Sequence, residues 1–162
     1  MKKASLFTAL ILLLAGCSGA GGNHSNTFKW GDLSISEFEN QENYFIVAPF
    51  EWMGKEPAVI ESVELVAQGE APIDTEDGQV HYTFHGADPS KGVGVYARED
   101  LGDLDEIRGF EVEGESRLVL EISLEHVQPD PNRRMKIKYT VDGKEHEQIL
   151  ESPMIEQLRT EE

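Results

Sequence analysis

The chain has 162 residues, with 31 acidic and 14 basic side chains, a formal net charge of −17 and a single cysteine. This length fits one domain with a tail, and such an acidic surface argues against nucleic-acid binding, because it repels phosphate backbones. One cysteine forms no internal disulfide and no cysteine-rich zinc site, and a content of 39% hydrophobic residues excludes a disordered polyelectrolyte.

The chain begins with a short apolar stretch behind two positive charges. Lys2 and Lys3 precede residues 6–16, an apolar run that only Thr8 interrupts. A run of this length is too short to span a bilayer, which needs about 20 residues, but it fits the hydrophobic region of a secretory signal. Segment 1–16 is therefore predicted to be a signal peptide that is removed from the mature chain.

The predicted signal ends in Leu14-Ala15-Gly16-Cys17, which resembles the lipobox of bacterial lipoproteins. The resemblance implies that the lipoprotein signal peptidase recognises Leu14, Ala15 and Gly16, and that the Cys17 thiol receives a diacylglycerol. Because two acyl chains give stable attachment, this covalent lipid is expected to anchor the chain to the outer face of the cell membrane, with no other cofactor. The alternative is an uncleaved anchor with an incidental cysteine.

Residues 17–27 are predicted to be the lipidated cysteine and a flexible tether. The ten residues after Cys17, SGAGGNHSNT, are small or polar and span about 17 Å on average. Removal of residues 1–16 takes away two lysines and no acid, which leaves 12 basic and 31 acidic side chains and a charge of −19. Residues 28–162 are expected to form one domain. Because this domain is strongly acidic, anionic headgroups are expected to repel it.

Alternation of apolar and polar side chains predicts a domain made mainly of strands. The alternation is clearest in residues 117–124 and 135–141. Further strands are predicted at 44–48, 59–66, 80–84, 93–97, 109–112 and 144–150. Turn residues lie between these segments, and the pattern favours an antiparallel β-sandwich of about seven to nine short strands.

Asp142-Gly143 predicts a two-residue hairpin turn, because a type I′ turn needs positive φ at both positions. Such a turn places Tyr139 opposite His146 and Ile137 opposite Gln148. The return strand alternates poorly, which favours an edge strand or one shifted by a bulge.

Helical signals are few. Ser152 before Pro153 is typical of an N-cap followed by proline at the first helical position, and it predicts a brief C-terminal helix. Residues 100–108 are a second candidate for a short helical turn.

The run GKEPAVIESVEL at 54–65 and the hairpin at 134–149 resemble small Ig-like domains of Gram-positive surface lipoproteins. The resemblance covers most of residues 40–150 and implies an all-β, Ig-like antiparallel β-sandwich, but no particular reaction. Ser18 is compatible with outer-membrane sorting in a Gram-negative cell, so the envelope type stays open.

Two groups of residues are candidates for metal binding. His81 and His85, with Asp88 nearby, lie on a predicted strand, where about 13 Å separates residues four apart, too far for one ion. The acidic run 99–106 is the better calcium candidate, because Asp100, Asp103 and Asp105 offer hard oxygen ligands. It does not follow the order of an EF-hand loop, and a solvated acidic loop is preferred, with a calcium-binding module kept as an alternative.

Catalytic motifs do not appear in the sequence. There is no G-x-S-x-G elbow, Ser90 lacks that context, and no Gly-Lys-Ser/Thr follows Gly92-Val93-Gly94. We therefore expect a non-catalytic binding or structural role and no catalytic residues. A surface hydrolase or metal-dependent enzyme built from scattered residues is the alternative.

Two further groups bear on partners. The aromatic residues Phe28, Trp30, Phe38, Phe45, Phe50 and Trp52 are expected in the core, with a ligand platform as the alternative. The basic residues Arg133, Arg134, Lys136 and Lys138 suit an anionic headgroup or a wall polymer, but charge pairing, such as Lys138 with Glu147, is preferred. The expected partners are the membrane, through the lipid, and an unidentified envelope protein or wall polymer, but no nucleic acid.

Overall fold

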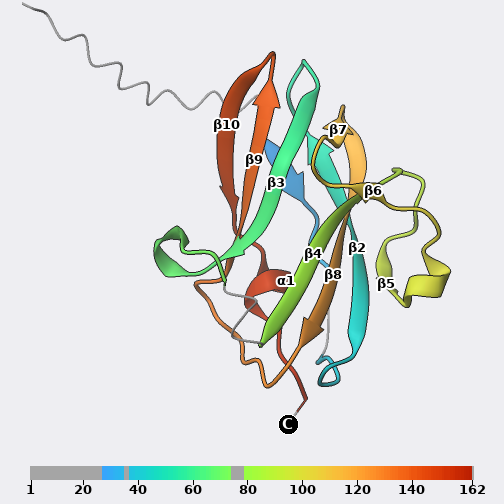
Figure 1. Cartoon of the computed structure of the whole chain (residues 1–162), viewed down its shortest axis with the longest axis vertical. Helices are drawn as coiled ribbons and strands as arrows, with labels where there is room; N and C mark the ends of the chain where they lie inside the picture. Colours follow the sequence, from blue (N-terminus) through green and yellow to red (C-terminus); the bar gives the residue numbers. More distant parts are fainter. Residues whose placement is uncertain (1–26, 35–36, 74–78, 162) are drawn as a thin grey trace, which may run out of the picture.

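The computed structural model describes residues 27–34, 37–73 and 79–161, which form two antiparallel β-sheets packed face to face (Figure 1). The strands are β1 (Phe28–Trp30), β2 (Asn43–Trp52), β3 (Ala58–Val66), β4 (Val80–Ala87), β5 (Gly94–Tyr96), β6 (Asp105–Glu106), β7 (Glu111–Val112), β8 (Glu115–Leu124), β9 (Arg134–Val141) and β10 (Lys144–Leu150). One sheet has the order β1-β2-β8-β4-β6, with β5 also paired to β2, and the other has the order β10-β9-β3-β7.

The prediction of an all-β antiparallel sandwich is confirmed. The described residues contain ten strands, more than the sequence predicted, because β1 and β6 are only three and two residues long. Strands this short leave no alternation to read. Two 3₁₀ turns, η1 (Gln68–Glu70) and η2 (Arg98–Asp100), and one helical turn, α1 (Pro153–Glu156), complete the fold.

The main core lies between the two sheets. The alternating apolar positions of β8, Leu118, Leu120 and Ile122, are fully buried there against Ile60 of β3 and Ile137 of β9. The face of β8 that the sequence predicted to be buried is therefore buried.

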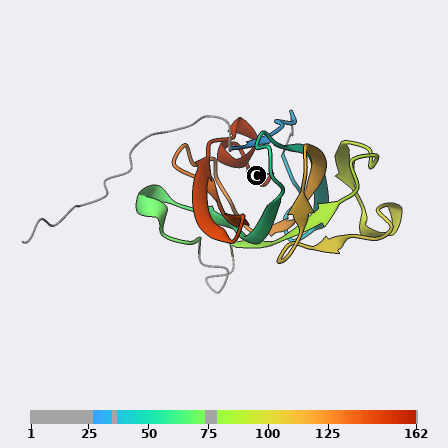
Figure 2. The same ribbon diagram turned by 90° about the horizontal axis from the view of Figure 1, so that it is seen from above.

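The opposite face of β8 carries a second, smaller core. The connection between β4 and β6 crosses this outer face and contributes β5, which pairs with β2, so that it lies on the side away from β9 and β10 (Figure 2). Leu101 of this connection packs with Phe45, Val47 and Val119. Val119 is therefore fully buried, although its face of the strand was predicted to be polar.

The β9–β10 hairpin has the predicted register. Tyr139 lies opposite His146, and Ile137 lies opposite Gln148. Asp142 and Gly143 have φ values of 51° and 71°, as a type I′ turn requires. Strand β10 is an edge strand of its sheet.

Gln148 closes one side of the sandwich. The Phe28 backbone N–H donates to Gln148 Oε1 at 2.8 Å, and Gln148 Nε2 donates to the Phe28 carbonyl at 2.9 Å. The side-chain amide thus joins β10 to β1 of the other sheet in the way that a neighbouring strand would. This contact accounts for a polar side chain on the half-buried part of an edge strand.

Replacing Gln148 with methionine is expected to lower the free energy of unfolding by about 1–3 kcal/mol, because it leaves the Phe28 N–H and carbonyl unsatisfied. Urea unfolding of the variant and the wild type measures the loss. The same substitution at the exposed Gln68 is the control, and we expect it to change stability by less than about 0.5 kcal/mol. Equal effects at the two positions would contradict the assigned role of Gln148.

The C-terminal helix begins as predicted. Ser152 is its N-cap and accepts a hydrogen bond from the Ile155 N–H, and Pro153 opens the helix. The second helical candidate, 100–108, is wrong. Gly102 has a φ of 66°, which ends η2, and Asp105 pairs with Gly86 as part of β6.

The first and the last described residues lie at opposite ends of the sandwich. The Thr27 carbonyl accepts a hydrogen bond from the N–H of Met53, directly after β2. Thr160 forms a bridge with Phe38 and donates its N–H to the Val127 carbonyl, beyond the far end of β8. We call these the Thr27 end and the C-terminal end, and the latter lies at the bottom of Figure 1.

Candidate functional site

The predicted lipidation motif lies outside the described residues, as does the tether as far as residue 26. The structure therefore does not describe Leu14, Ala15, Gly16 or Cys17. It describes only the point where the chain enters the domain. That point is Thr27, beside the β2–β3 turn. Within the described ranges, no helix is long and apolar enough to cross a membrane.

The histidines of β4 lie on the outer face of the sheet and serve different contacts. His85 Nε2 lies 2.9 Å from Glu121 Oε2, and Asn43 Nδ2 donates to Glu121 Oε1 at 3.0 Å. His81 is exposed. Asp88 lies in the next loop, where it accepts the backbone N–H of Ser90, so this serine is part of a local turn.

Burial acts to raise the pKa of the Glu121 carboxyl, but the hydrogen bonds from Asn43 and His85 outweigh it and lower the pKa overall. A carboxyl whose pKa is lower in the folded state stabilises the protein above its unfolded pKa of about 4.3, and this stability is lost as the pH falls through the folded pKa. The carboxylate is thus a source of acid sensitivity.

We expect Glu121→Gln to lose less stability than the wild type when the pH falls from about 6 to about 3, with a difference of at most about 1 kcal/mol because the pair is partly solvated. Urea unfolding at the two pH values measures the difference, with Glu145→Gln, at an exposed position of β10, as the control. The idea fails if Glu121→Gln and the wild type lose the same free energy on acidification.

The calcium candidates are spread over three structural contexts. Asp100 ends η2, Asp103 lies in the loop that follows, and Asp105 is in β6, and all three are exposed. In the part of the chain that the structure describes, no group of three or more His, Cys, Asp or Glu side chains is placed to hold a metal ion.

The aromatic residues fill the core, as expected. Phe28, Phe38, Phe45, Phe50 and Trp52 are at most 3% exposed, and Trp30 is half-buried. The Phe28 ring stacks on Phe50 with a centroid separation of 4.6 Å and meets the Tyr139 ring of the other sheet at 5.0 Å. These rings hold the two sheets together at the Thr27 end.

The basic run does not form a continuous patch. Lys136 Nζ lies 3.0 Å from both Glu70 Oε2 and Glu147 Oε1. Glu147 stands opposite Lys138 in the hairpin register, but its carboxylate reaches across the diagonal to Lys136. The expected charge pairing therefore exists with a different lysine.

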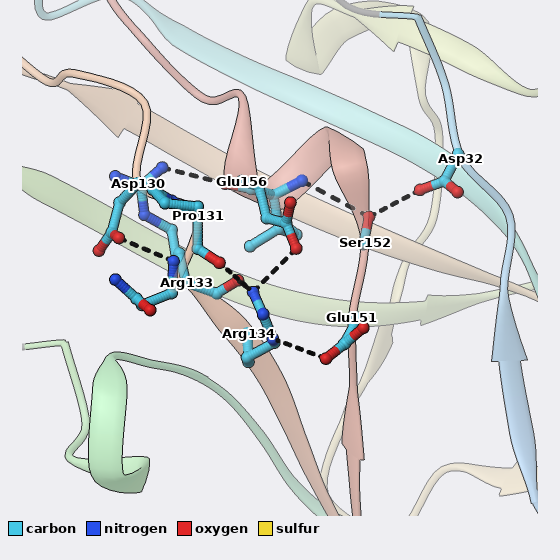
Figure 3. Close-up of polar contacts among 10 residues, drawn as sticks. Asp32, Asp130, Pro131, Arg133, Arg134, Glu151, Ser152 and Glu156 are labelled. Carbon is cyan, nitrogen blue, oxygen red and sulfur yellow. Dashed lines mark hydrogen bonds and ion pairs between the residues drawn. The ribbon is translucent and has the colours of Figure 1, made fainter.

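Arg134 joins β9 to the C-terminal helix. Its Nη1 lies 2.8 Å from Glu156 Oε1 and its Nε lies 3.4 Å from Glu151 Oε1 (Figure 3). On the same helix, the N-cap Ser152 donates its hydroxyl to Asp32 Oδ1 at 2.8 Å. Polar contacts from β9 and from the segment after β1 thus hold the helix in place.

Arg133 departs most from its expected place, because only 5% of its surface is exposed. Its Nη1 donates to the carbonyls of Ile155 and Leu158 at 3.0 and 3.2 Å, and its Nη2 donates to the carbonyl of Gln128 at 3.1 Å. Burial lowers the pKa of Arg133, against the opposing charge of Asp130. The sequence offered no sign of this burial, because residues 22 and 25 positions away supply two of the carbonyls.

A groove of about 680 Å³ lies beside this arginine, between the β3–β4 and β8–β9 connections at the C-terminal end. Ile73, Val80 and Val127 are among its apolar lining residues, and Asp130 and Arg133 are among its polar ones. We call it the C-terminal groove. Its volume is within the usual range for small-ligand sites, about 300–1,000 Å³.

Comparison with known proteins adds no family to these observations. No family model matches the chain, and no curated protein matches it. The interpretation of function therefore starts from the residues and their geometry.

Proposed function

We propose that the mature chain is an extracytoplasmic lipoprotein, anchored to the outer face of the cell membrane by a lipid on Cys17, with a non-catalytic binding or structural role. One observation carries the proposal. The only cysteine of the chain follows Leu14-Ala15-Gly16, directly after a charged start and a short apolar run. This combination is what a signal for lipidation and cleavage requires.

The domain suits such an anchor in two ways. Its core is built from apolar side chains, and the only cysteine lies outside it at position 17, so lipidation takes no thiol from the fold. The chain also joins the domain at one end, where Thr27 bonds to Met53. A tether of about 17 Å then keeps that end near the headgroups, and the C-terminal end points away from the membrane.

The resemblance of the domain to small Ig-like domains is part of the same proposal. Two antiparallel sheets packed face to face are the architecture that small Ig-like surface domains share. In antibody variable domains, which share this architecture, the loops at one end of the sandwich bind the partner. In this chain, the loops at the C-terminal end would be the ones presented to partners.

Membrane fractionation tests the proposal. We expect the chain in the membrane fraction, released by detergent but not by about 1 M salt, because salt screens ionic contacts and leaves an acyl anchor in place. Protease added to spheroplasts is expected to digest it, as an extracytoplasmic position requires. Release by salt alone, or protection from the protease, would overturn the proposal.

A further inference from the structure

Strand β1 is the first element of the domain, so a pull on an anchored Cys17 reaches the fold at Thr27 and passes into β1. The fold sets the direction of that pull. Strand β1 is antiparallel to β2, and Phe28 lies opposite Trp52, the last residue of β2. The strand therefore runs from the Thr27 end toward the interior of the sandwich. A pull away from the C-terminal end acts along the axis of β1.

Hydrogen bonds hold β1 on both of its sides. On the β2 side, the Met53 N–H donates to the Thr27 carbonyl at 3.0 Å, and three residue pairs follow. Directly after β1, the Gly31 N–H donates to the Pro49 carbonyl at 2.8 Å. On the other side, the Gln148 amide exchanges two hydrogen bonds with the β1 backbone. Ladder hydrogen bonds run perpendicular to the strands, so a pull along β1 loads the bonds to β2 together.

The side chain of Phe28 resists the same movement. It is 1% exposed, and its ring lies 4.6 Å from that of Phe50 and 5.0 Å from that of Tyr139 in the other sheet. A slip of one residue toward the Thr27 end would put Lys29, which is exposed, in the place of Phe28 in the core. Burial of an unpaired ammonium group is costly. Strand β1 therefore does not slide out gradually, and it must leave its place in one step.

A further contact ties the segment after β1 to the other sheet. Asp32 Oδ1 accepts the Ser152 hydroxyl at 2.8 Å, at the start of α1 (Figure 3). Arg134 of β9 pairs with Glu156 of the same helix. The contacts of β1 and of its C-terminal extension therefore reach β2 in one sheet and β9 and β10 in the other.

From this geometry we infer that β1 is a tension clamp, which transmits the pull of the lipid anchor to both sheets. The domain then stays folded while a partner bound at the C-terminal end pulls against the membrane. The inference rests on the proposed anchor and adds a mechanical role for one strand. A pull along β1 must break its hydrogen bonds together, whereas a pull that separates β1 from β2 breaks them one after another and needs less force.

Optical tweezers test the inference by pulling the mature polypeptide, residues 17–162 without lipid, in two directions. One DNA handle is attached to the Cys17 thiol in both cases. The second handle is attached through Gln128→Cys, at an exposed position of the C-terminal end, or through Met53→Cys, where Met53 is 40% exposed and bonded to Thr27. The first variant is pulled along β1. The second is pulled so that β1 and β2 separate from their shared end.

The readout is the waiting time before the first lengthening of the chain at one constant force, which reports the rate of forced unfolding. We expect this time to be at least about tenfold longer for Gln128→Cys than for Met53→Cys, because several hydrogen bonds must break in one step. Equal waiting times, or a shorter time for the pull along β1, would overturn the inference.

A second pair of variants tests whether β10 shares the pull. Added to Gln128→Cys, the replacement Gln148→Met removes both hydrogen bonds between β10 and β1, and we expect it to shorten the waiting time at least about fivefold. Gln68→Met, at an exposed position outside β1 and β10, is expected to leave the waiting time unchanged. Equal waiting times for these two variants would contradict the role of the second sheet in the clamp.

The clamp and the anchor fail in different ways. The tweezers measurement uses a chain without lipid, so its result does not depend on lipid attachment in the cell. Equal waiting times in the two directions contradict only the clamp. A chain from cells that carries no lipid contradicts the anchor and leaves the difference between the two directions in place.

Discussion

Replacing Cys17 with alanine is expected to abolish lipid attachment completely and to leave a precursor that keeps residues 1–16. The thiol is the acceptor that the lipobox resemblance assigns, and the chain has no second cysteine to replace it. Metabolic labelling with an alkyne fatty acid measures the attachment, and gel mobility of the polypeptide measures the processing.

Ser18→Ala is the matched control, because it changes the next residue and leaves the thiol intact. We expect this variant to keep both the lipid label and the mature mobility. If Cys17→Ala keeps its label, or migrates as the wild type does, Cys17 is not the attachment point. The label distinguishes lipidation from retention by an uncleaved apolar signal, which would also hold the chain at the membrane.

Replacing Phe28 with alanine is expected to lower the free energy of unfolding by about 3–5 kcal/mol, the usual cost of removing a buried aromatic ring. Only 1% of Phe28 is exposed, and its ring lies 4.6 Å from those of Phe50 and Trp52 and 5.0 Å from that of Tyr139. The substitution removes contacts with both sheets. Since small domains are stable by about 5–15 kcal/mol, this loss is a large share of the total.

Urea unfolding followed by tryptophan fluorescence measures this effect. Met53→Ala is the control, because Met53 lies at the same end of the sandwich but is 40% exposed, and we expect it to cost less than about 0.5 kcal/mol. A loss below about 1 kcal/mol for Phe28→Ala would show that the ring is not part of the core.

The features that the sequence predicted correctly depend on neighbouring residues. The Asp142-Gly143 turn sets the register of β9 and β10 because its backbone conformation is local. The cap formed by Ser152 is local for the same reason. The strand alternation of residues 117–124 also needs only one buried face to be recognised.

The features that the sequence did not reveal depend on distant residues. Val119 is buried because the connection between β4 and β6 folds over the outer face of the sheet. Strand β1 is held partly by Gln148, 120 residues away. Such pairings leave no periodic pattern in either segment.

The candidate functional features differ in the same respect, because one depends on neighbouring residues and the other on distant ones. The lipidation motif is a contiguous run that ends at Cys17 and is readable from the sequence. The C-terminal groove is not readable, because Arg133 is one of four basic residues within 133–138 for which the sequence favoured charge pairing. Its burial depends on the carbonyls of Ile155 and Leu158, which the fold brings to it.

The intact mass of the chain purified from membranes tests the central claim most directly. Removal of 16 residues from 162 leaves 146, and we predict a polypeptide that begins at Cys17 and carries at least a diacylglycerol on its thiol. Mild base is expected to reduce this mass by the ester-linked acyl chains. A polypeptide that begins at Met1, or one with a free thiol at Cys17, would contradict the account.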